Sequence, residues 1–450
     1  MNSPPFEIRA HRHRPLGMTP ARFLRDYWQK RPLLVRNAFP GLVTPLSPDE
    51  LAGLACMDGA LARIVSRGTK RRPRARSLDG ERRADDRWTV RTGPFDDATF
   101  AKLPESRWTL LVQDVDKWDD ATAALLDRFA FIPSWRIDDV MVSYAADGGG
   151  VGAHVDQYDV FLLQGLGRRR WRISIDPHAS HESIDGVELK LLRRFTPTHE
   201  WTLDRGDMLY LPPGIPHDGT AVGECMTYSI GMRAPSAAEM LLDFAEYVAQ
   251  SLPDSLRYRD SGLRPAGGDG EIDETAIARV TAALASAGFV TRRKPGRNRK
   301  RVGVGVAGAS AEGGFADGHI GTLEGFARGV PASMLRTWFG RFITRYRSDF
   351  DFDADAAPMP NKAFAHAIDR GAMVEIAPRA RAAWQREQHG ATLFVTGRAW
   401  ACSTRLAHRI ASRRPFALGE FARSPTDRDV LRALAGCGII RLQRNRKPKR

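Results

Sequence analysis

His154 and Asp156 form an H-x-D pair directly after the glycine-rich segment GGGVG. Alternate residues of a β-strand point to the same face, so a strand beginning here would aim one imidazole and one carboxylate into a common interior. These are two of the three ligands of a facial metal triad. The third ligand must come from elsewhere in the chain. The best candidate is His217 in GDMLYLPPGIPH, which we expect at the end of the LYLPP strand.

Ligands from two neighbouring strands of a barrel would leave the opposite face of the metal open, as in non-haem Fe(II) oxygenases. An H-x-D pair alone is a weak signal because such pairs occur by chance. Here it follows glycines that allow close approach of the backbone, and it precedes a G-D-x-x-Y-x-P segment. Metal binding is therefore favoured over the alternative, ordinary polar residues at a barrel mouth.

The same alternation extends the predicted site to flanking residues. Tyr158 would continue the face of the H-x-D pair. On the preceding strand, Asp139, Met141 and Ser143 share one face. For Asp139 the alternative is a simple turn residue before the strand.

The following strand, GRRRWRI, carries closely spaced arginines on both faces. Arg169 and Trp171 share one face, and Arg168, Arg170 and Arg172 share the other. A guanidinium that points into a barrel is an expensive buried charge unless it meets an anion. A dicarboxylate cosubstrate would supply that anion, because guanidinium binds carboxylate through two hydrogen bonds. The alternative is an acidic neighbour for Arg169.

The length of 450 residues predicts two or three domains. Many short strands with Gly/Pro punctuation up to residue 235 indicate a β-barrel or jelly roll. Residues 236–347 contain amphipathic helices around a flexible basic insertion at 288–318. Residues 355–450 contain short strands, two helices and a closing strand, an arrangement that resembles a winged helix with a basic tail. The predicted class is α+β.

Three tracts, 67–76, 292–301 and 441–450, contain 19 Lys and Arg residues and no acidic residue. Subtracting these 19 charges from the total of +15 leaves −4 for the rest of the chain. The folded body is therefore mildly acidic. Such tracts are typically solvated, and contact with RNA or the ribosome is the sharper hypothesis.

The four cysteines are scattered and lack a C-x-x-C pair, which argues against a disulfide framework and fits a reducing cytoplasm. No apolar run reaches the 18 residues typical of a membrane helix, and the N-terminus lacks the apolar core of a secretory signal. We therefore expect a cytoplasmic protein without a membrane partner.

Several longer segments carry a family resemblance: PLLVRNAF, TLLVQDVDKW, DDVMVSY, GGGVGAHVDQYDVFLLQGLGRRRWRI, GDMLYLPPGIPHDG and YSIGMRAP. They resemble the bacterial ribosomal oxygenases, JmjC-type 2-oxoglutarate- and Fe(II)-dependent arginine hydroxylases, over roughly residues 16–236. The resemblance implies a double-stranded β-helix (cupin/JmjC jelly roll), a helical dimerisation region and a C-terminal winged helix. It also implies Fe(II), 2-oxoglutarate and O₂ as cofactors, a homodimer, and hydroxylation of an arginine β-carbon on large-subunit ribosomal protein sixteen.

The resemblance also assigns roles to individual residues. It implies His154, Asp156 and His217 as iron ligands, Arg169 and Ser143 as 2-oxoglutarate contacts, and Asp139, Met141, Tyr158 and Ser229 as contacts of the substrate arginine. A carboxylate such as Asp139 suits a guanidinium substrate. The basic segments at 67–76 and 288–318 look longer than the family pattern.

Two other functions remain open from the sequence. The first is a DNA-binding regulator in which the barrel senses a ligand and ACSTRLAHRIA is the recognition helix. The second is a 2-oxoglutarate oxygenase that acts on another protein, including a lysyl demethylase-like activity, or on a small molecule. The motifs indicate oxygenase chemistry more firmly than they select arginine over lysine or histidine.

Overall fold

The fold is taken from a computed structural model of the chain. It describes residues 6–11, 16–68, 88–184, 189–261, 274–286, 331–345, 352 and 356–443. The chain forms two compact units. The first comprises Met1–Ala234, Tyr346–Thr396 and Trp400–Arg450, and the second comprises Pro235–Arg345 and Gly397–Ala399. The predicted insertion at 288–318 and most of the three basic tracts lie outside the described residues.

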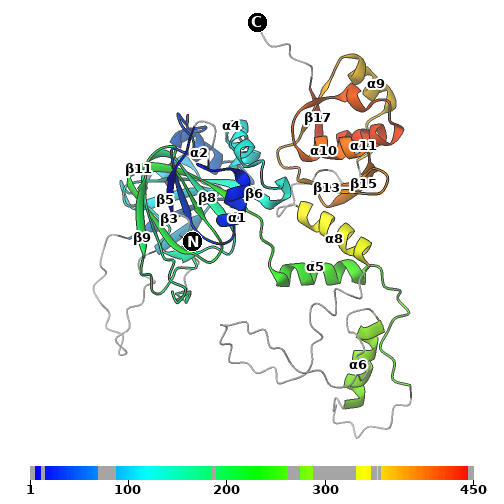
Figure 1. The fold of residues 1–450 in the computed structure, drawn as a ribbon, viewed down its shortest axis with the longest axis horizontal. Coiled ribbons are helices and arrows are strands. Elements are labelled where there is room, and N and C mark those ends of the chain that lie inside the picture. The colour runs from blue at the N-terminus through cyan, green and yellow to red at the C-terminus, as the bar shows by residue number, and fades with distance from the viewer. Residues whose placement is uncertain are drawn as a thin grey trace. The chain divides into compact units, whose positions relative to one another are not determined.

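An 11-stranded sheet dominates the first unit and curves into a barrel (Figure 1). Its strands are β1 (Glu7–Arg9), β2 (Leu33–Arg36), β3 (Ala62–Arg67), β4 (Trp88–Thr92), β5 (Trp108–Val112), β6 (Ile137–Ala145), β7 (His154–Val155), β8 (Val160–Ile173), β9 (His199–Leu203), β10 (Met208–Leu211) and β11 (Pro216–Met232). The main path runs β1-β2-β10-β8-β11-β6-β5-β3-β4, with β7 paired to β11 and β9 paired to β8.

β8 and β11 form the longest antiparallel ribbon of the barrel, and its register changes at a bulge. Val222 pairs with Arg168 before the shift and Met226 pairs with Leu166 after it. Gly167 faces the bulge in a left-handed conformation, and a Cβ there would lie 1.9 Å from the carbonyl oxygen of Glu224. Only glycine fits this position. The bulge bends the ribbon, so that its two arms can face one interior.

Strand alternation separates an apolar outer face from a polar inner one. On β6, Val140 and Val142 are fully buried in the main hydrophobic cluster, which also contains Phe23 of the N-terminal helix and Phe161 of β8. Residues that alternate with them, such as Met141 and Ser143, point to the opposite side. The interior of the barrel is therefore left to polar groups.

Short helices flank the N-terminal part of the sheet: α1 (Pro20–Asp26), α2 (Pro48–Ala55), α3 (Asp97–Ala101), α4 (Asp120–Ala124) and the 3₁₀ turns η2 (Val115–Lys117), η3 (Leu125–Phe129) and η4 (Ser134–Arg136). The hydroxyl of Thr19 caps α1 directly before its first-turn proline. The apolar stretch ATAALLDRF does not form one continuous helix but divides at Leu125 into α4 and η3.

The C-terminal part of the first unit has a separate core that includes Leu406, Leu431 and Ile439. Its helices are α9 (Asn361–Asp369), α10 (Thr404–Ala411) and α11 (Pro425–Gly436), with the 3₁₀ turn η5 (Leu418–Phe421). Its strands are β12 (Met373–Ile376), β13 (Ala382–Arg386), β14 (Ala391–Val395), β15 (Arg398–Cys402), β16 (Phe416–Ala417) and β17 (Ile440–Gln443). They form two three-stranded sheets, β16-β12-β17 and β13-β14-β15.

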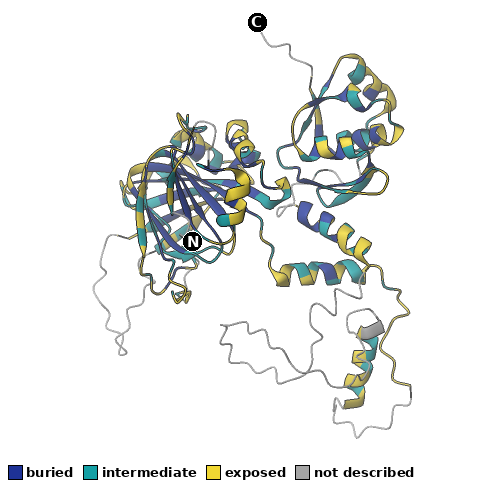
Figure 2. Cartoon of the chain, in the orientation of Figure 1, coloured by how far each residue is buried: buried dark blue, intermediate teal, exposed yellow. Residues whose placement is uncertain are grey.

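The second unit contains α5 (Ala237–Ala249), α6 (Glu274–Ser286) and α8 (Ala332–Thr344). Phe244 of α5 packs against Trp338 and Phe342 of α8. Figure 2 shows that α6 carries mostly exposed and half-buried residues. Among the helices that the structure describes, none has both the length and the apolar character needed to cross a bilayer.

Candidate functional site

The structure brings His154, Asp156 and His217 together. One ligand atom from each lies within 4.8 Å of the others. The distances are 3.9 Å from His154 Nε2 to Asp156 Oδ1 and 3.6 Å from His217 Nε2 to Asp156 Oδ2. The two histidines are direct partners in the pairing of β7 with β11. No other such cluster of His, Cys, Asp or Glu is found among the described residues.

Two local expectations about these residues are wrong. β7 ends at Val155, so Asp156 is not a strand residue on the face of His154. It lies where the chain leaves the sheet, and its carbonyl oxygen accepts the Gly214 N–H at 2.8 Å. His217 does not end the LYLPP strand but is the second residue of β11. A bend, rather than strand alternation, carries the carboxylate back to the two imidazoles.

Both histidines are held in the tautomer that metal binding requires. Nδ1 of His154 lies 2.9 Å from the carbonyl oxygen of Gly152, and Nδ1 of His217 lies 2.8 Å from that of Ile215. Each Nδ1–H therefore donates to the backbone and leaves the Nε2 lone pair facing Asp156. Burial, and then the neighbouring His154, lower the pKa of His217 to about 4, so its imidazole is neutral. A set of two imidazoles and one carboxylate fits Fe(II).

The GGGVG glycines allow the backbone approach that the sequence predicts. A Cβ on Gly149 would lie 2.3 Å from the carbonyl oxygen of Trp108, and one on Gly150 would lie 2.4 Å from that of Gly219. A side chain at either position would push the neighbouring strand away. The glycines thus bring the loop before His154 against the strands that build the site.

Arg169 points into the barrel, and its side chain is almost fully buried at 3% exposure. Its guanidinium donates to Ser143 Oγ at 3.2 Å, to Thr227 Oγ1 at 3.3 Å and to the carbonyl oxygen of Gly219 at 3.3 Å. Its Nε has no hydrogen-bond partner. Burial lowers the pKa of Arg169.

An acidic neighbour for Arg169, the alternative left open by the sequence, is not found. Within the described residues no carboxylate forms an ion pair with this guanidinium, and the nearby Asp218 pairs with Arg172. The arginine also lies beside the triad. Its Cζ is 5.1 Å from the ring centre of Trp171, whose ring lies 6.0 Å from that of His217. A buried cation with only neutral partners fits a carboxylate-bearing cosubstrate.

The residues expected to contact the substrate occupy one region. On β6, Asp139 and Met141 pair with Gly231 and Ser229 of β11. A Cβ on Gly231 would lie 3.2 Å from Asp139 Oδ1, so this glycine leaves room for the carboxylate. Burial, and then the charges of Asp114 and Asp116, raise the pKa of Asp139 to about 6.

Tyr158 is 39% exposed and lies in a bend before β8, so its expected place on a strand face is wrong. Its hydroxyl nevertheless faces the site. Desolvation, and then the carboxylates of Asp156 and Asp139, raise its pKa. Tyr158 is therefore electrostatically coupled to both the triad and the pocket.

Sequence reasoning missed several residues that support the site. Thr227 donates to Gln164 Oε1 at 3.2 Å while it accepts from Arg169. The alternation of small and polar residues in MTYSIGM could have indicated Thr227 as an inward residue. Asp159 accepts from Tyr210 Oη at 2.6 Å and Gln29 Nε2 at 3.0 Å, which anchors the bend after the triad. No local pattern identifies Asp159.

Two family profiles match the chain: "JmjC domain" over residues 124–240 and "ROXA-like winged helix" over residues 332–439. The ribosomal protein uL16 3-hydroxylase of Escherichia coli is 41% identical over 247 residues, which are 54% of this chain and 60% of the relative. A probable ribosomal oxygenase of Haemophilus influenzae is 37% identical over 244 residues, 53% of this chain and 56% of the relative. These alignments thus span less than two thirds of the curated relatives.

The structural comparison covers more of the molecule. The ribosomal oxygenase YcfD of E. coli, solved with cobalt and 2-oxoglutarate, is 28% identical with a TM-score of 0.66. The match covers 95% of this chain and 98% of that one. It confirms the predicted jelly roll and C-terminal winged helix. Residues 124–240 therefore carry a JmjC domain, and the fold as a whole is similar to that of a bacterial ribosomal oxygenase.

Proposed function

We propose that the chain is an Fe(II)- and 2-oxoglutarate-dependent oxygenase that hydroxylates the β-carbon of an arginine in ribosomal protein uL16. The observation that carries this proposal is the metal triad beside Arg169, a buried cation with only neutral partners. The similarity to a uL16 3-hydroxylase supports the substrate protein. The carboxylate of Asp139 supports a cationic side chain as the target.

His154, Asp156 and His217 would hold the iron through two Nε2 atoms and one carboxylate oxygen. Bound together, Fe(II), 2-oxoglutarate and O₂ supply the oxidising chemistry, in which one oxygen atom enters a C–H bond while 2-oxoglutarate becomes succinate and CO₂. Arg169 binds the distal carboxylate of 2-oxoglutarate, and the Ser143 hydroxyl orients that guanidinium. The protein thus fixes the cosubstrate from the side opposite its metal-binding end.

On the substrate side, Asp139 accepts the guanidinium of the target arginine. Met141 and Ser229, neighbours across β6 and β11, line the aliphatic part of the pocket, and Tyr158 borders it near the metal. These contacts orient the side chain so that one carbon faces the reactive centre. Lysine would satisfy the charge of Asp139 but not its two-pronged geometry, which favours arginine.

The direct test is mass spectrometry of ribosomal proteins from a strain that lacks this gene. We expect uL16 to lose the mass of one oxygen atom on a single arginine peptide, and the purified enzyme with Fe(II) and 2-oxoglutarate to restore it. Fragment ions locate the oxygen on the side chain. Unchanged uL16, or a modified lysine or histidine peptide, would contradict the proposed substrate.

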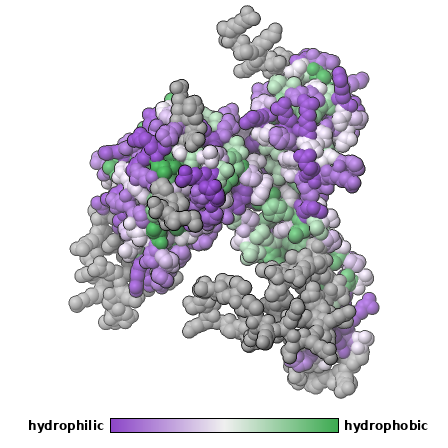
Figure 3. Space-filling model, viewed as in Figure 1, coloured by the Kyte–Doolittle hydropathy of each residue, from purple (hydrophilic) through white to green (hydrophobic). Residues whose placement is uncertain are grey.

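We also propose that the second unit forms a homodimer. On α5, Leu241 and Leu242 are 45% and 73% exposed, although Phe244 on the same helix is buried against α8. Figure 3 shows hydrophobic surface gathered in this region. An exposed apolar face of this kind is typical of an interface. Sedimentation should give a dimer at micromolar concentration and a monomer for Leu242→Asp, whereas a monomeric parent protein would contradict the proposal.

Contact of the basic tracts with RNA or the ribosome remains a prediction. If it occurs, binding of the protein to ribosomes should weaken steeply with salt. Removal of residues 444–450 should reduce that salt dependence and leave hydroxylation of free uL16 unchanged. An unaltered salt dependence would assign no such role to the tail.

A further inference from the structure

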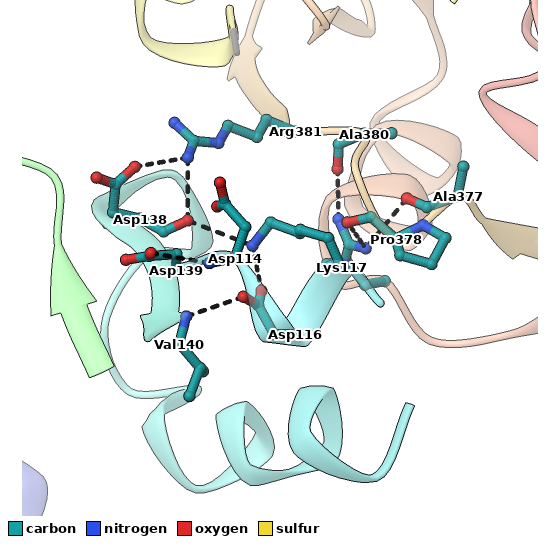
Figure 4. A network of polar contacts seen from close by, with 11 residues as sticks. Asp114, Asp116, Lys117, Asp138, Asp139, Val140, Ala377, Pro378, Ala380 and Arg381 are labelled. Atoms are coloured by element: carbon teal, nitrogen blue, oxygen red, sulfur yellow. Dashed lines mark hydrogen bonds and ion pairs between the residues drawn. The ribbon is translucent and has the colours of Figure 1, made fainter. Parts of the chain in front are cut away.

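A buried ion pair joins the winged-helix region to the barrel within the first unit. Arg381, directly before β13, is 8% exposed, and Asp138 at the start of β6 is 7% exposed. One nitrogen of Arg381 donates to Asp138 Oδ1 at 2.5 Å and to the Asp138 carbonyl oxygen at 3.0 Å (Figure 4). The arginine therefore holds both the side chain and the backbone of this residue.

Two charged side chains of η2 hold the start of β6. Lys117 donates to the Asp138 carbonyl oxygen at 3.3 Å and pairs with Asp116. Asp116 in turn accepts the Val140 N–H at 2.8 Å. The two neighbours of Asp139 at the start of β6, Asp138 and Val140, are thus tied to charged side chains.

A second arginine, Arg413, secures the turn that carries Arg381. Arg413 donates to the carbonyl oxygens of Ala377 at 3.2 Å and Pro378 at 2.9 Å, and also to that of Ala380. Figure 4 shows these carbonyl groups beside Arg381. The turn that carries Arg381 is therefore held by hydrogen bonds within the winged-helix region as well as by its contacts with the barrel.

Asp138 and Asp139 point to opposite sides of β6 because neighbouring strand residues alternate. One carboxylate meets Arg381, and the other enters the proposed substrate pocket, where the Asp114 N–H donates to its Oδ2 at 3.2 Å. A rotation of the strand that releases Asp138 would also move the Asp139 carboxylate. Lys117, and not Arg381, is the cation whose charge opposes the rise in the pKa of Asp139. Arg381 can therefore affect Asp139 only by fixing the position of its carboxylate.

We propose that Arg381 is a positioning residue for substrate binding: by fixing Asp138, it orients Asp139 toward the guanidinium of the substrate. This inference rests on the proposed function, in which Asp139 receives the target arginine. It gives the winged helix a role in the oxygenase reaction that needs no nucleic acid. Its consequence is specific, because the cosubstrate is held elsewhere by Arg169.

The experiment measures KM separately for recombinant uL16 and for 2-oxoglutarate in the full-length enzyme. Arg381→Met should raise the KM for uL16 about 10-fold, on the order of the loss of one charge-assisted hydrogen bond. The KM for 2-oxoglutarate should change less than about twofold, since Arg169 is untouched. Asp138→Asn should reproduce this pattern, and Arg381→Lys should restore part of the affinity. Arg386→Met, an exposed arginine of β13, is the matched control and should behave as the parent.

Combination with Asp139→Asn separates positioning from general damage. If Arg381 acts through Asp139, Arg381→Met should add less than about twofold to the KM for uL16 in the Asp139→Asn background. Full additivity, or an equal rise in both KM values, overturns the inference. If Arg381→Met does not fold, Arg381→Lys is measured in both backgrounds, and an unchanged KM for uL16 again overturns the inference. If Asp139→Asn alone leaves the KM for uL16 unchanged, the proposed substrate pocket itself fails.

Discussion

Arg169 in the barrel and Arg381 at the junction are both buried, but within the described residues only Arg381 has an anionic partner. Arg169 donates only to two hydroxyls and a carbonyl oxygen, whereas Arg381 meets the carboxylate of Asp138. Burying a charge is costly unless an opposite charge accompanies it. The paired arginine therefore belongs to the permanent structure. The arginine with neutral partners is suited to an anion that arrives and leaves during turnover.

The largest expected effect concerns the triad beside Arg169. His154→Ala removes one of the three proposed metal ligands, and succinate formation from 2-oxoglutarate should fall by more than about 100-fold. Even loss of the groups that hydrogen-bond to metal ligands costs about 10- to 100-fold. The matched control is His178→Ala, an exposed histidine outside the triad. Full activity of His154→Ala would remove the basis for treating this end of the barrel as a metal site.

The two arginines should differ in what they contribute to folding. Arg381→Ala leaves the Asp138 carboxylate buried without its cation and should lower the free energy of unfolding by about 3–5 kcal/mol. Arg169→Ala removes a desolvated cation that has no anionic partner, so the loss should stay below about 1 kcal/mol. Urea unfolding measures both. Equal losses would contradict the distinction between a structural and a ligand-binding arginine.

For the concentration of 2-oxoglutarate that turnover requires, Arg169 should matter more than Arg381. Arg169→Ala should raise the concentration of 2-oxoglutarate required for half-maximal rate by about 100-fold, as expected for a charge-assisted contact worth about 1.5–3 kcal/mol. Arg168→Ala on the other face of β8 is the control and should have little effect. An unchanged requirement in Arg169→Ala would point to a different anchor.

The smallest expected effect is a pH dependence of substrate binding. The pKa of Asp139 is raised to about 6, so this carboxyl is protonated below that pH and ionised above it. Only the ionised form attracts a guanidinium. The kcat/KM for uL16 should therefore rise as pH increases through about 6, and Asp139→Asn should flatten that rise. The same pH dependence in Asp139→Asn would assign the titration to another group.

The sequence predicted the architecture of the site where strand alternation was regular. The shared face of Arg169 and Trp171 on β8 and that of Asp139, Met141 and Ser143 on β6 both followed from period two, whereas the choice of Arg169 as the inward arginine came from the family resemblance. Alternation failed at Asp156, because the strand that carries His154 ends after two residues. A bend of this kind depends on contacts with distant segments, which a local pattern does not encode.

Contacts between distant parts of the chain could not be predicted. Arg381 and Asp138 are 243 residues apart, and although Asp138 begins the segment DDVMVSY, nothing in that segment indicates its partner. Asp159 is buried by Tyr210 and Gln29, which come from two other segments. Thr227 illustrates the intermediate case, since its inward face could be inferred but its contact with Arg169 requires the bend in β11.

The bulge between β8 and β11 also limits how this protein can evolve. Most surface loops tolerate insertions and deletions, because a change in loop length does not alter which side chains point into the core. Deletion of Arg168 from β8 would exchange the inward and outward faces of the strand after it. Arg170 would then replace Arg169 inside, and the aromatic ring beside His217 would face solvent. The number of residues at this corner is therefore constrained by the site, although the corner residues are not among the proposed metal or substrate contacts.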